Sequence, residues 1–278
     1  MTTYNWEEAL ALCLGSIAQQ RVLPVDVVVA DDGSREETGA LVRRLAREFP
    51  VPLHHVWQPD AGFRAARVRN LGTARCTGTY VIYVDGDMVL HPDFIADHVR
   101  LARAGTYLQG GRLNASPGET RRLLAGAAPR FSPLMPGKYK RRHAIHWPWL
   151  AARKLARERG IVMSCNMGIW RADLDRVNGF DEDFEGWGRE DDDLAARLRH
   201  VGVERRQLKF AGLAVHLWHR TRWPDGVPPT EEIPNDRLLR RTLETRAVRC
   251  ARGLDRHVAL FSGVHDAQTS LSAAQTAA

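Results

Sequence analysis

Short apolar runs alternate with longer amphipathic segments through the first 110 residues. The runs are rich in Val, Ile, Leu and Tyr and short enough for strands buried on both faces, which predicts strands at 25–30, 53–57, 80–84 and 106–109. The segments between them carry apolar residues at helical spacing, which predicts helices at 7–20, 34–47, 64–75 and 92–104. Because strands and helices alternate, the sequence predicts an α/β fold with a mostly parallel, Rossmann-like sheet in one doubly wound layer.

The amino-terminal residues depart from this pattern. No apolar run marks a strand before the first predicted helix, although a fold of this kind normally opens with a central strand. Two explanations stay open: the start is truncated, or another segment fills that position. Asn5 is expected to cap the first helix, and Ser34 the second, with Glu37 at capping-box spacing.

The second half is less regular. Residues 110–137 are rich in Gly, Pro, Arg and Ala, which predicts an active-site loop or connector. A second organised block follows at 161–219, with a strand at 165–170 and a short helix that Asp173 caps and that ends at Asn178-Gly179. A basic helix is expected at 235–252, before a polar, disordered tail.

Composition is that of an ordinary globular protein of 278 residues, 44% hydrophobic and 26% charged. No run of 18 apolar residues predicts a membrane-spanning helix. Glu7 and Glu8 interrupt the first apolar segment, so no signal peptide is predicted and a cytoplasmic location is expected. Neither a zinc knuckle nor a disulfide framework is predicted, because the four cysteines are far apart: Cys13, Cys76, Cys165 and Cys250.

The net charge of +7 is unevenly distributed, with basic residues concentrated between Lys138 and Arg159. Such a segment suits nucleic acid, anionic lipid headgroups or a phosphorylated substrate. The interleaved Trp147 and Trp149 favour a membrane surface or a saccharide, since indoles prefer interfaces and stack on sugar rings. A solvated helix face with a tryptophan beneath it explains the same pattern without a ligand.

Acidic residues follow two predicted strands. Asp85 and Asp87, separated by Gly86, come directly after strand 80–84, and Asp31 and Asp32 end strand 25–30. Because the carboxyl ends of parallel strands open into one crevice, these acids are expected to face a common ligand. Hard oxygen ligands suit Mn²⁺ or Mg²⁺, which keep positions for phosphate oxygens. Taken alone, each motif is equally typical of a solvated turn.

Two further groups of residues suit catalysis. Arg69 and Asn70 lie on the helix that leads to strand 80–84. A guanidinium at this position could bind a diphosphate, or it could form ion pairs on a solvent-exposed face. Four acids, at 190–193, begin a later helix, and helical geometry places Asp191 on the face of the apolar residues that follow. Crowding of acids raises the pKa of some of them, which suits a general base.

Aromatic and histidine residues complete the candidate set. Gly186 and Gly188 flank Trp187 and predict a mobile elbow that closes an aromatic side chain over a sugar. His216 and His219 follow a predicted strand and, close to aspartates, would complete an Mn²⁺ site. A single histidine is more often structural, so the interpretation as a metal site depends on the presence of two histidines.

The ordered combination of motifs resembles the nucleotide-sugar-dependent glycosyltransferases of family 2, which have the GT-A fold. The resemblance covers residues 2 to about 220 and depends on Thr3-Tyr4-Asn5, Asp31-Asp32-Gly33-Ser34, Arg69-Asn70, Asp85-Gly86-Asp87 and the block from Gly179 to Asp191. That last block is similar to the C-terminal galactosyltransferase motif shared by β-1,4-galactosyltransferases, polypeptide N-acetylgalactosaminyltransferases and bacterial chondroitin polymerases.

The resemblance implies an inverting transfer from a UDP-sugar to a saccharide or lipid-linked saccharide, with Mn²⁺ (or Mg²⁺) as cofactor. It implies a general base at Asp191 with Glu190 beside it. The residues that it implies for donor binding are Tyr4, Asp31, Asp32, Arg69 and Asp85. The metal ligands that it implies are Asp87 and a histidine, His216 in preference to His219. The residues that it implies for acceptor binding are Trp187, Asn166 and Asp192.

The resemblance also implies how the chain is divided. Residues 1–110 form a nucleotide-sugar-binding half, 111–225 an acceptor-binding and catalytic-base half of the same domain, and 226–278 a basic helix with a disordered tail. Peripheral membrane contact on the inner face is a further expectation, and nucleic acid is not an expected partner. The alternatives are a sugar nucleotidyltransferase, which would need a glycine-rich phosphate loop that is not apparent, and a basic module that binds nucleic acid or an anionic surface.

Overall fold

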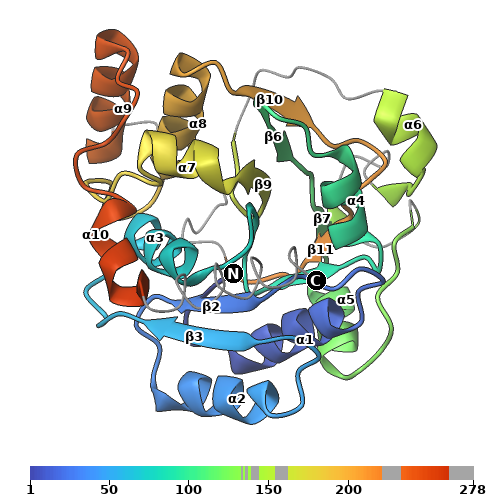
Figure 1. The fold of residues 1–278 in the computed structure, drawn as a ribbon. Helices are drawn as coiled ribbons and strands as arrows, with labels where there is room; N and C mark the ends of the chain where they lie inside the picture. The colour runs from blue at the N-terminus through green and yellow to red at the C-terminus, as the bar shows by residue number, and fades with distance from the viewer. Residues whose placement is uncertain (133, 135–136, 139–143, 154–161, 221–232, 263–278) are drawn as a thin grey trace, which may run out of the picture.

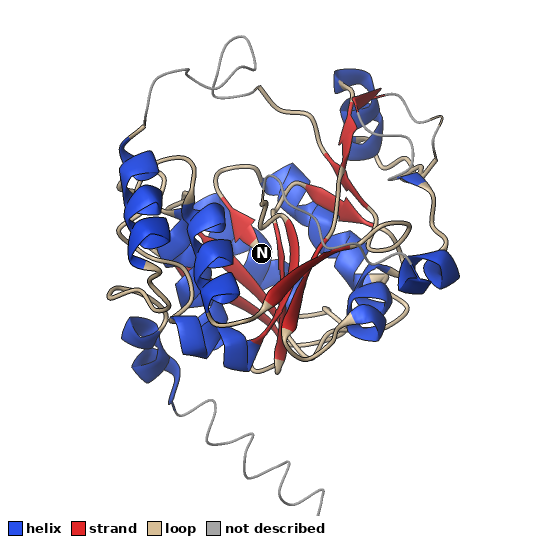
Figure 2. Cartoon of the chain, turned by 90° about the horizontal axis from the view of Figure 1, so that it is seen from above, coloured by secondary structure: helices blue, strands red, loops and turns tan. Residues whose placement is uncertain are grey.

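Among the residues that the structure describes, three small β-sheets form the centre of the molecule, and helices flank them on both sides (Figures 1 and 2). The computed structural model describes residues 1–132, 134, 137–138, 144–153, 162–220 and 233–262. The first sheet is parallel and has the strand order β1 (Thr2–Thr3), β2 (Val27–Asp31), β3 (Leu53–Trp57). The helices that accompany it are α1 (Glu7–Ala18), α2 (Glu36–Ala46) and α3 (Ala65–Arg75).

The second sheet is mixed and has the order β10 (Glu204–Gln207), β6 (Thr106–Gln109), β9 (Asn166–Trp170), β4 (Tyr80–Val84). Strand β10 is parallel to β6, whereas β9 runs antiparallel to both of its neighbours. Two helices of the second half pack on this sheet: α7 (Arg171–Val177) and α8 (Glu190–His200). Leu194 and Leu198 of α8 are fully buried in the core beneath it, as the helical spacing predicts.

The third sheet joins the two halves of the chain in the order β5 (Met88–Leu90), β11 (Ala214–His216), β7 (Leu113–Ala115), β8 (Gly137–Lys138). Strand β11 runs antiparallel to β5 and pairs His216 with Met88, the residue that follows Asp87. His216 is therefore brought close to Asp87. Around it lie α4 (Phe94–Leu101), α5 (Pro117–Leu124) and α6 (Pro148–Arg153).

The carboxyl-terminal part of the described chain returns to the rest of the fold. Helix α9 (Pro234–Thr245) lies beside α8, and α10 (Asp255–Val258), followed by the 3₁₀ turn Ala259–Phe261, lies beside α3 (Figure 1). Thr242 Oγ1 donates a 2.7 Å hydrogen bond to the fully buried carboxylate of Asp193. This region is therefore two helices, and the single helix predicted at 235–252 was wrong beyond Thr245.

The α/β class and the alternation of strands and helices are confirmed, and β3 and β6 have the predicted limits. The first strand corrects the prediction. Thr2 and Thr3 pair in parallel with Ala30 and Asp31, and Thr2 also bridges to Asp85. Two polar residues form no apolar run, which is why the pattern showed no strand there.

The expected helix caps are also corrected. Asn5 has a φ of 45° and does not cap α1; its side-chain oxygen accepts a 2.9 Å hydrogen bond from the backbone N–H of Arg35, before α2. Ser34 does not cap α2; its hydroxyl accepts a 2.9 Å hydrogen bond from Asn5 N–H. These two side chains join the turns after β1 and β2. Asp173 lies in the first turn of α7 rather than at its cap.

The stretch 110–137 is more regular than predicted. It contains β7 and α5, and α5 has a conventional start with Pro117 in its first turn. Ser116 caps it, because its hydroxyl accepts a 3.1 Å hydrogen bond from Glu119 N–H. The prediction of a loop missed these elements because both are short.

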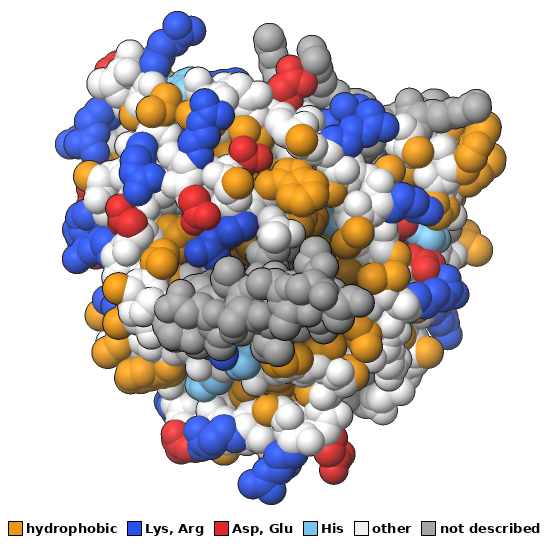
Figure 3. Space-filling model, in the orientation of Figure 1, with side chains coloured by type: hydrophobic (Ala, Val, Ile, Leu, Met, Phe, Trp, Pro, Cys, Tyr) orange, Lys and Arg blue, Asp and Glu red, His pale blue; other side chains and the backbone are white. Residues whose placement is uncertain are grey.

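Half of the basic segment 138–159, including six of its eight Lys and Arg residues, lies outside the described residues. Trp147 and Trp149, within its described part, are 53% and 59% exposed. Lys and Arg side chains are scattered over the face that Figure 3 shows, with acidic side chains between them. No helix formed by the described residues is long and apolar enough to cross a bilayer.

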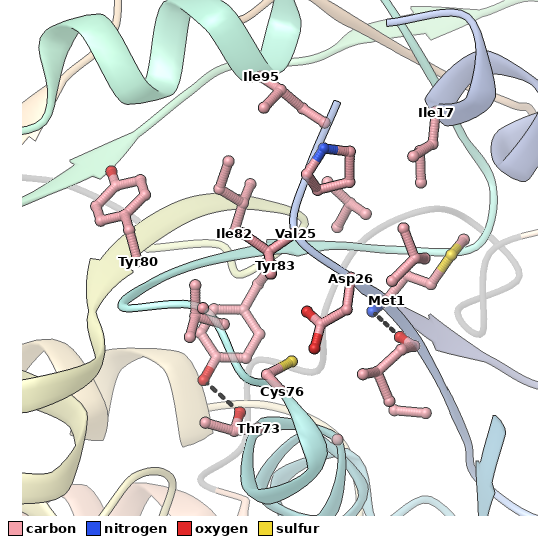
Figure 4. A pocket seen from close by; sticks show the side chains of 18 of the residues that line it. Met1, Ile17, Val25, Asp26, Thr73, Cys76, Tyr80, Ile82, Tyr83 and Ile95 are labelled. Atoms are coloured by element: carbon pink, nitrogen blue, oxygen red, sulfur yellow. Dashed lines mark hydrogen bonds between the residues drawn. The ribbon is translucent and has the colours of Figure 1, made fainter. Parts of the chain in front are cut away.

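An apolar cavity of about 370 Å³ lies between β2 and β4 (Figure 4). Its lining includes Tyr80 and Ile82 of β4 and Ile95 of α4, and the Met1 amino group donates a 2.8 Å hydrogen bond to Val28 O at its edge. The cavity lies beside the bodies of these strands, whereas the candidate acids follow their carboxyl ends. Its lining nevertheless includes Thr2 and Arg69, so the cavity adjoins the polar site described below.

Gly179 offers a test of the packing between the two halves. It ends α7 with a φ of +66°, and a Cβ there would overlap Asn70 Oδ1, which accepts a 2.8 Å hydrogen bond from Phe180 N–H. We expect Gly179→Ala to destabilise the fold by about 3 kcal/mol or more in a denaturant titration, since strain and overlap add. Gly186→Ala is the control: its φ is +73° with open space around it, so only about 1–2 kcal/mol of strain is expected. Equal losses would contradict the proposed overlap.

Candidate active site

Arg69 joins three of the predicted acids. It projects from α3, is only 7% exposed, and its Nη1 lies 2.9 Å from Glu190 Oε1 and 3.4 Å from Asp191 Oδ1. Its Nη2 lies 3.8 Å from Asp85 Oδ1. The carboxyl end of β4 and the start of α8, more than 100 residues apart in sequence, therefore meet at one guanidinium.

The short strand β1 holds the turn after β4. Thr2 Oγ1 donates a 2.8 Å hydrogen bond to Asp85 Oδ1, and Gly86 N–H donates a 2.7 Å hydrogen bond to Thr2 O. A Cβ on residue 86 would lie 2.8 Å from Thr2 O, so this close approach requires glycine. The turn thereby fixes the direction in which Asp87 points.

Asp87, His216 and His219 form a group suited to a divalent cation. Asp87 Oδ2 lies 3.2 Å from His216 Nε2 and 3.5 Å from His219 Nε2. Ligand atoms about 2.1 Å from one ion lie roughly 3.0–3.4 Å apart, which is close to these separations. Burial opposes the charge on Asp87, but His216, His219 and Arg112 together hold its pKa below the usual value.

A second observation supports the same interpretation. Asp87 Oδ1 is buried and has no hydrogen-bond partner among the described residues. A buried carboxylate oxygen without a partner is costly, and a bound cation removes that cost. The residues therefore fit Mn²⁺ or Mg²⁺ with imidazole and carboxylate ligands.

Asp191 has the properties of a general base. Its Oδ2 accepts a 2.9 Å hydrogen bond from Ser164 N–H, and its Oδ1 faces Arg69. Burial is the largest influence and, with the nearby charge of Glu190, raises the pKa of Asp191 to about 7, although Arg69 and Ser164 oppose this. Glu190 is buried against Arg69 and holds the guanidinium in place.

The predicted donor-binding residues differ in burial and in hydrogen-bond partners. Asp32 Oδ2 accepts a 2.9 Å hydrogen bond from Arg64 N–H, and burial raises its pKa. Tyr4 is half exposed, and its hydroxyl donates a 3.0 Å hydrogen bond to Asp60. Asp31 differs from both, because it is fully buried.

Both carboxylate oxygens of Asp31 have partners inside the protein. Ser34 N–H donates to Oδ1 at 2.7 Å, and His55 Nε2 lies 2.9 Å from Oδ2. These contacts hold the turn after β2, and donor binding by Asp31 stays a prediction.

The predicted acceptor residues do not all meet. Trp187 is 44% exposed, between Gly186 and Gly188, which both have positive φ. Asn166 is fully buried: its amide donates 2.8 Å hydrogen bonds to Gly111 O and Gly212 O, and its oxygen lies 2.9 Å from His98 Nε2. Both polar atoms of its side chain therefore have partners within the protein, and its place in an acceptor site stays a prediction.

Asp192 is turned towards a neighbour on its own helix. Its carboxylate lies 3.3 Å from Arg189 Nη1, and Arg189 also pairs with Asp236 of α9 at 2.6 Å. Asp192 therefore takes part in the contact between α8 and α9, and not in the group around Arg69.

Two participants, Thr2 and Ser164, carried no sequence signal, and no particular role was predicted for a third, Arg112. Thr2 holds Asp85, and Ser164 holds Asp191 through its backbone N–H, which any residue would supply. Arg112 lies near Asp87 and 3.7 Å from Cys165 Sγ. Neither an acid pattern nor a spacing indicates such residues; their positions depend on the packing of distant segments.

A parallel α/β unit with acids after its strands, joined to a mixed sheet with an acidic helix, is the GT-A glycosyltransferase fold. The chain belongs to glycosyltransferase family 2, whose family model matches residues 1–176. A second model, described as the N-terminal domain of galactosyltransferase, matches residues 155–220 and so includes Asp191 and both histidines of the Asp87 group. The family predicted from the motifs is confirmed.

Curated relatives agree with this family. A validoxylamine A glucosyltransferase of Streptomyces hygroscopicus subsp. limoneus is 30% identical over 225 residues, which are 72% of this chain and 47% of the relative. The chondroitin synthase of Escherichia coli is 26% identical over 253 residues, 84% of this chain and 35% of the relative. The chain thus spans half or less of the curated relatives it matches.

Solved structures share the fold at low identity. S. aureus TarS 1–349 in complex with UDP-GlcNAc has a TM-score of 0.60 at 15% identity and covers 92% of this chain and 67% of that chain. The mannosyltransferase PcManGT of Pyrobaculum calidifontis in complex with GDP-Man and Mn²⁺ has a TM-score of 0.51 at 22% identity and covers 77% of this chain and 55% of that one. These similarities establish the GT-A fold.

Proposed function

We propose that this chain transfers a sugar from a uridine diphosphate donor to a hydroxyl of a saccharide acceptor, with inversion at the anomeric carbon. The observation that carries the proposal is the junction at Arg69, which brings Asp85 of the Asp85-Gly86-Asp87 turn and Asp191 to one guanidinium. A cation group and a base are therefore neighbours in one site, as group transfer between two bound substrates requires.

On the donor side, Asp87 with His216 and His219 would hold Mn²⁺ or Mg²⁺. When bound, such a cation neutralises the charge that develops on the leaving diphosphate. Arg112, whose charge acts on Asp87, adds a second positive group at this end of the site. Asp32 follows β2 and Tyr4 follows β1, at the strand ends where the nucleoside would bind.

On the acceptor side, Asp191 accepts the proton of the attacking hydroxyl. Ser164 N–H and Arg69 orient its two oxygens, so the carboxylate is held in one direction. A single base beside a cation site suits one in-line displacement, which inverts the anomeric configuration. Trp187, exposed on its glycine elbow, would stack on the acceptor ring.

The relatives support the choice of substrates. The solved neighbours are in complex with UDP-GlcNAc and with GDP-Man, which supports a nucleoside diphosphate sugar as donor. Validoxylamine A glucosyltransferase and chondroitin synthase support a saccharide-like acceptor by their names. Within this proposal residues 1–110 bind the donor and 111–225 supply the acceptor side, while the exposed Trp147 and Trp149 would contact a membrane surface peripherally.

A panel of nucleotide sugars tests the proposal. With Mn²⁺ and a set of saccharide acceptors, we expect release of UDP from at least one UDP-sugar, and we expect EDTA to abolish it. Coupled detection of UDP measures the rate, and NMR of the product gives the anomeric configuration. Release of no nucleoside diphosphate from any donor would contradict the transferase, and a retained configuration would contradict inversion.

A further inference from the structure

A second group of ligand-type side chains lies outside the proposed active site. His91 and Asp93 are in the turn between β5 and α4, and His146 is in the segment before α6. One ligand atom from each lies within 4.8 Å of the other two. We propose that His91, Asp93 and His146 bind a divalent cation of the zinc type, which fastens the segment before α6 to the start of α4.

The separations fit a metal better than direct hydrogen bonds. Asp93 Oδ2 lies 3.7 Å from His91 Nδ1 and 3.8 Å from His146 Nδ1, both too long for hydrogen bonds. Two ligands about 2.0–2.1 Å from one tetrahedral ion are roughly 3.4 Å apart, so movements of a few tenths of an ångström would bring both histidines to this separation from Asp93. Two imidazoles and one carboxylate favour Zn²⁺, with the fourth position left for water.

Asp97 orients His146 for this role. His146 Nε2 lies 2.9 Å from Asp97 Oδ2, and that oxygen also accepts a 2.8 Å hydrogen bond from Gly212 N–H. Since Asp97 is buried and accepts the proton of Nε2, the lone pair of His146 is at Nδ1, facing Asp93. A carboxylate behind the histidine is the usual second partner of a metal-binding imidazole.

The two histidine rings lie against one another, with centroids 4.3 Å apart and planes inclined by 34°. Burial, together with the neighbouring His146, lowers the pKa of His91. Two imidazoles packed beside one carboxylate are ligand types that suit a divalent cation.

Two existing contacts would be exchanged on binding. Arg21 Nη1 lies 2.8 Å from Asp93 Oδ1 and 2.6 Å from Oδ2, and its side chain is 70% exposed, so it can keep Oδ1 and release Oδ2. Asp93 N–H donates a 3.1 Å hydrogen bond to His91 Nδ1, which metal binding would replace. The guanidinium of Arg21 is accessible to water, so the loss of its contact with Oδ2 costs little.

This site is distinct from the Asp87 group. Asp87 precedes β5 and His91 follows it, so the two sites are at opposite ends of that strand, with about 13 Å of extended chain between them. No residue is shared. The expected role is structural, because the segment that carries Trp147 and Trp149 would be held at His146.

Zinc binding measured in an Asp87→Ala background separates this site from the active site. After dialysis against Zn²⁺ and removal of free metal, we expect about one equivalent of Zn²⁺ per chain in Asp87→Ala and an increase in its melting temperature with Zn²⁺. Adding His146→Ala should weaken this binding tenfold or more and remove the increase. The matched control is His54→Ala, a histidine of β3 that pairs with Arg75 and should leave zinc binding unchanged.

Asp93→Asn in the same background provides a second variant, at a turn rather than in a core, and circular dichroism verifies that each variant is folded. Co²⁺ in place of Zn²⁺ should give the intense visible absorption of a tetrahedral site only where His146 is present. Zinc binding that is equal with and without His146, or that is lacking in folded Asp87→Ala, would overturn the proposal. Because no step measures sugar transfer, the result does not depend on the proposed function.

Discussion

Asp191→Asn should lower kcat by about 10²–10⁴-fold while the affinity for the UDP-sugar changes little, because the amide keeps the shape of the side chain but cannot accept a proton. Transfer rates and calorimetric titration of the donor measure the two effects separately. Asp192→Asn is the matched control, since this neighbouring acid is paired with Arg189 and not with Arg69, so near-normal kcat is expected.

The same base predicts the pH dependence. Since the pKa of Asp191 is raised to about 7, the group is protonated and inactive below that pH, and activity should rise as pH increases through about 7. The residual activity of Asp191→Asn should lack this rise. An unchanged pH profile in the variant, or a kcat within a few fold of the unmodified protein, would exclude Asp191 as the base.

Asp87→Ala should abolish measurable transfer by weakening cation-dependent binding of UDP on the order of 10²-fold. The reason is that Asp87 supplies the negatively charged ligand of the cation, beside the imidazole ligands of His216 and His219. Calorimetric titration of UDP with and without Mn²⁺ measures the effect. Ala in place of His216, which is 13% exposed, should cost more affinity than the same change at His219, which is 47% exposed.

Asp93→Ala provides the comparison for this prediction. It removes an aspartate from the other histidine group, at the far end of β5, so it should leave Mn²⁺-dependent binding of UDP unchanged. Binding of UDP by Asp87→Ala that still responds to Mn²⁺ as in the unmodified protein would show that the cation is held elsewhere.

Residues whose roles follow from local pattern were predictable. The acids of Asp85-Gly86-Asp87 follow a strand that the apolar run at 80–84 reveals, and Asp191 begins a helix whose apolar face is readable from Leu194 and Leu198. Asp31 and Asn166 show the limit of such inference. Their residue types suit ligand binding, yet each is fully buried and hydrogen-bonded within the protein, and burial depends on what packs against a side chain.

By itself, the sequence determined the succession of strands and helices, the acids after β2 and β4, and the family, because these depend on residues close together in the chain. Only the tertiary structure decided that Thr2 and Thr3 form a strand beside β2, that Arg69 is buried between β4 and α8, and that Ser164 holds Asp191. These contacts join residues 16 to 122 positions apart, and no local pattern of polarity records which distant segment will supply the partner.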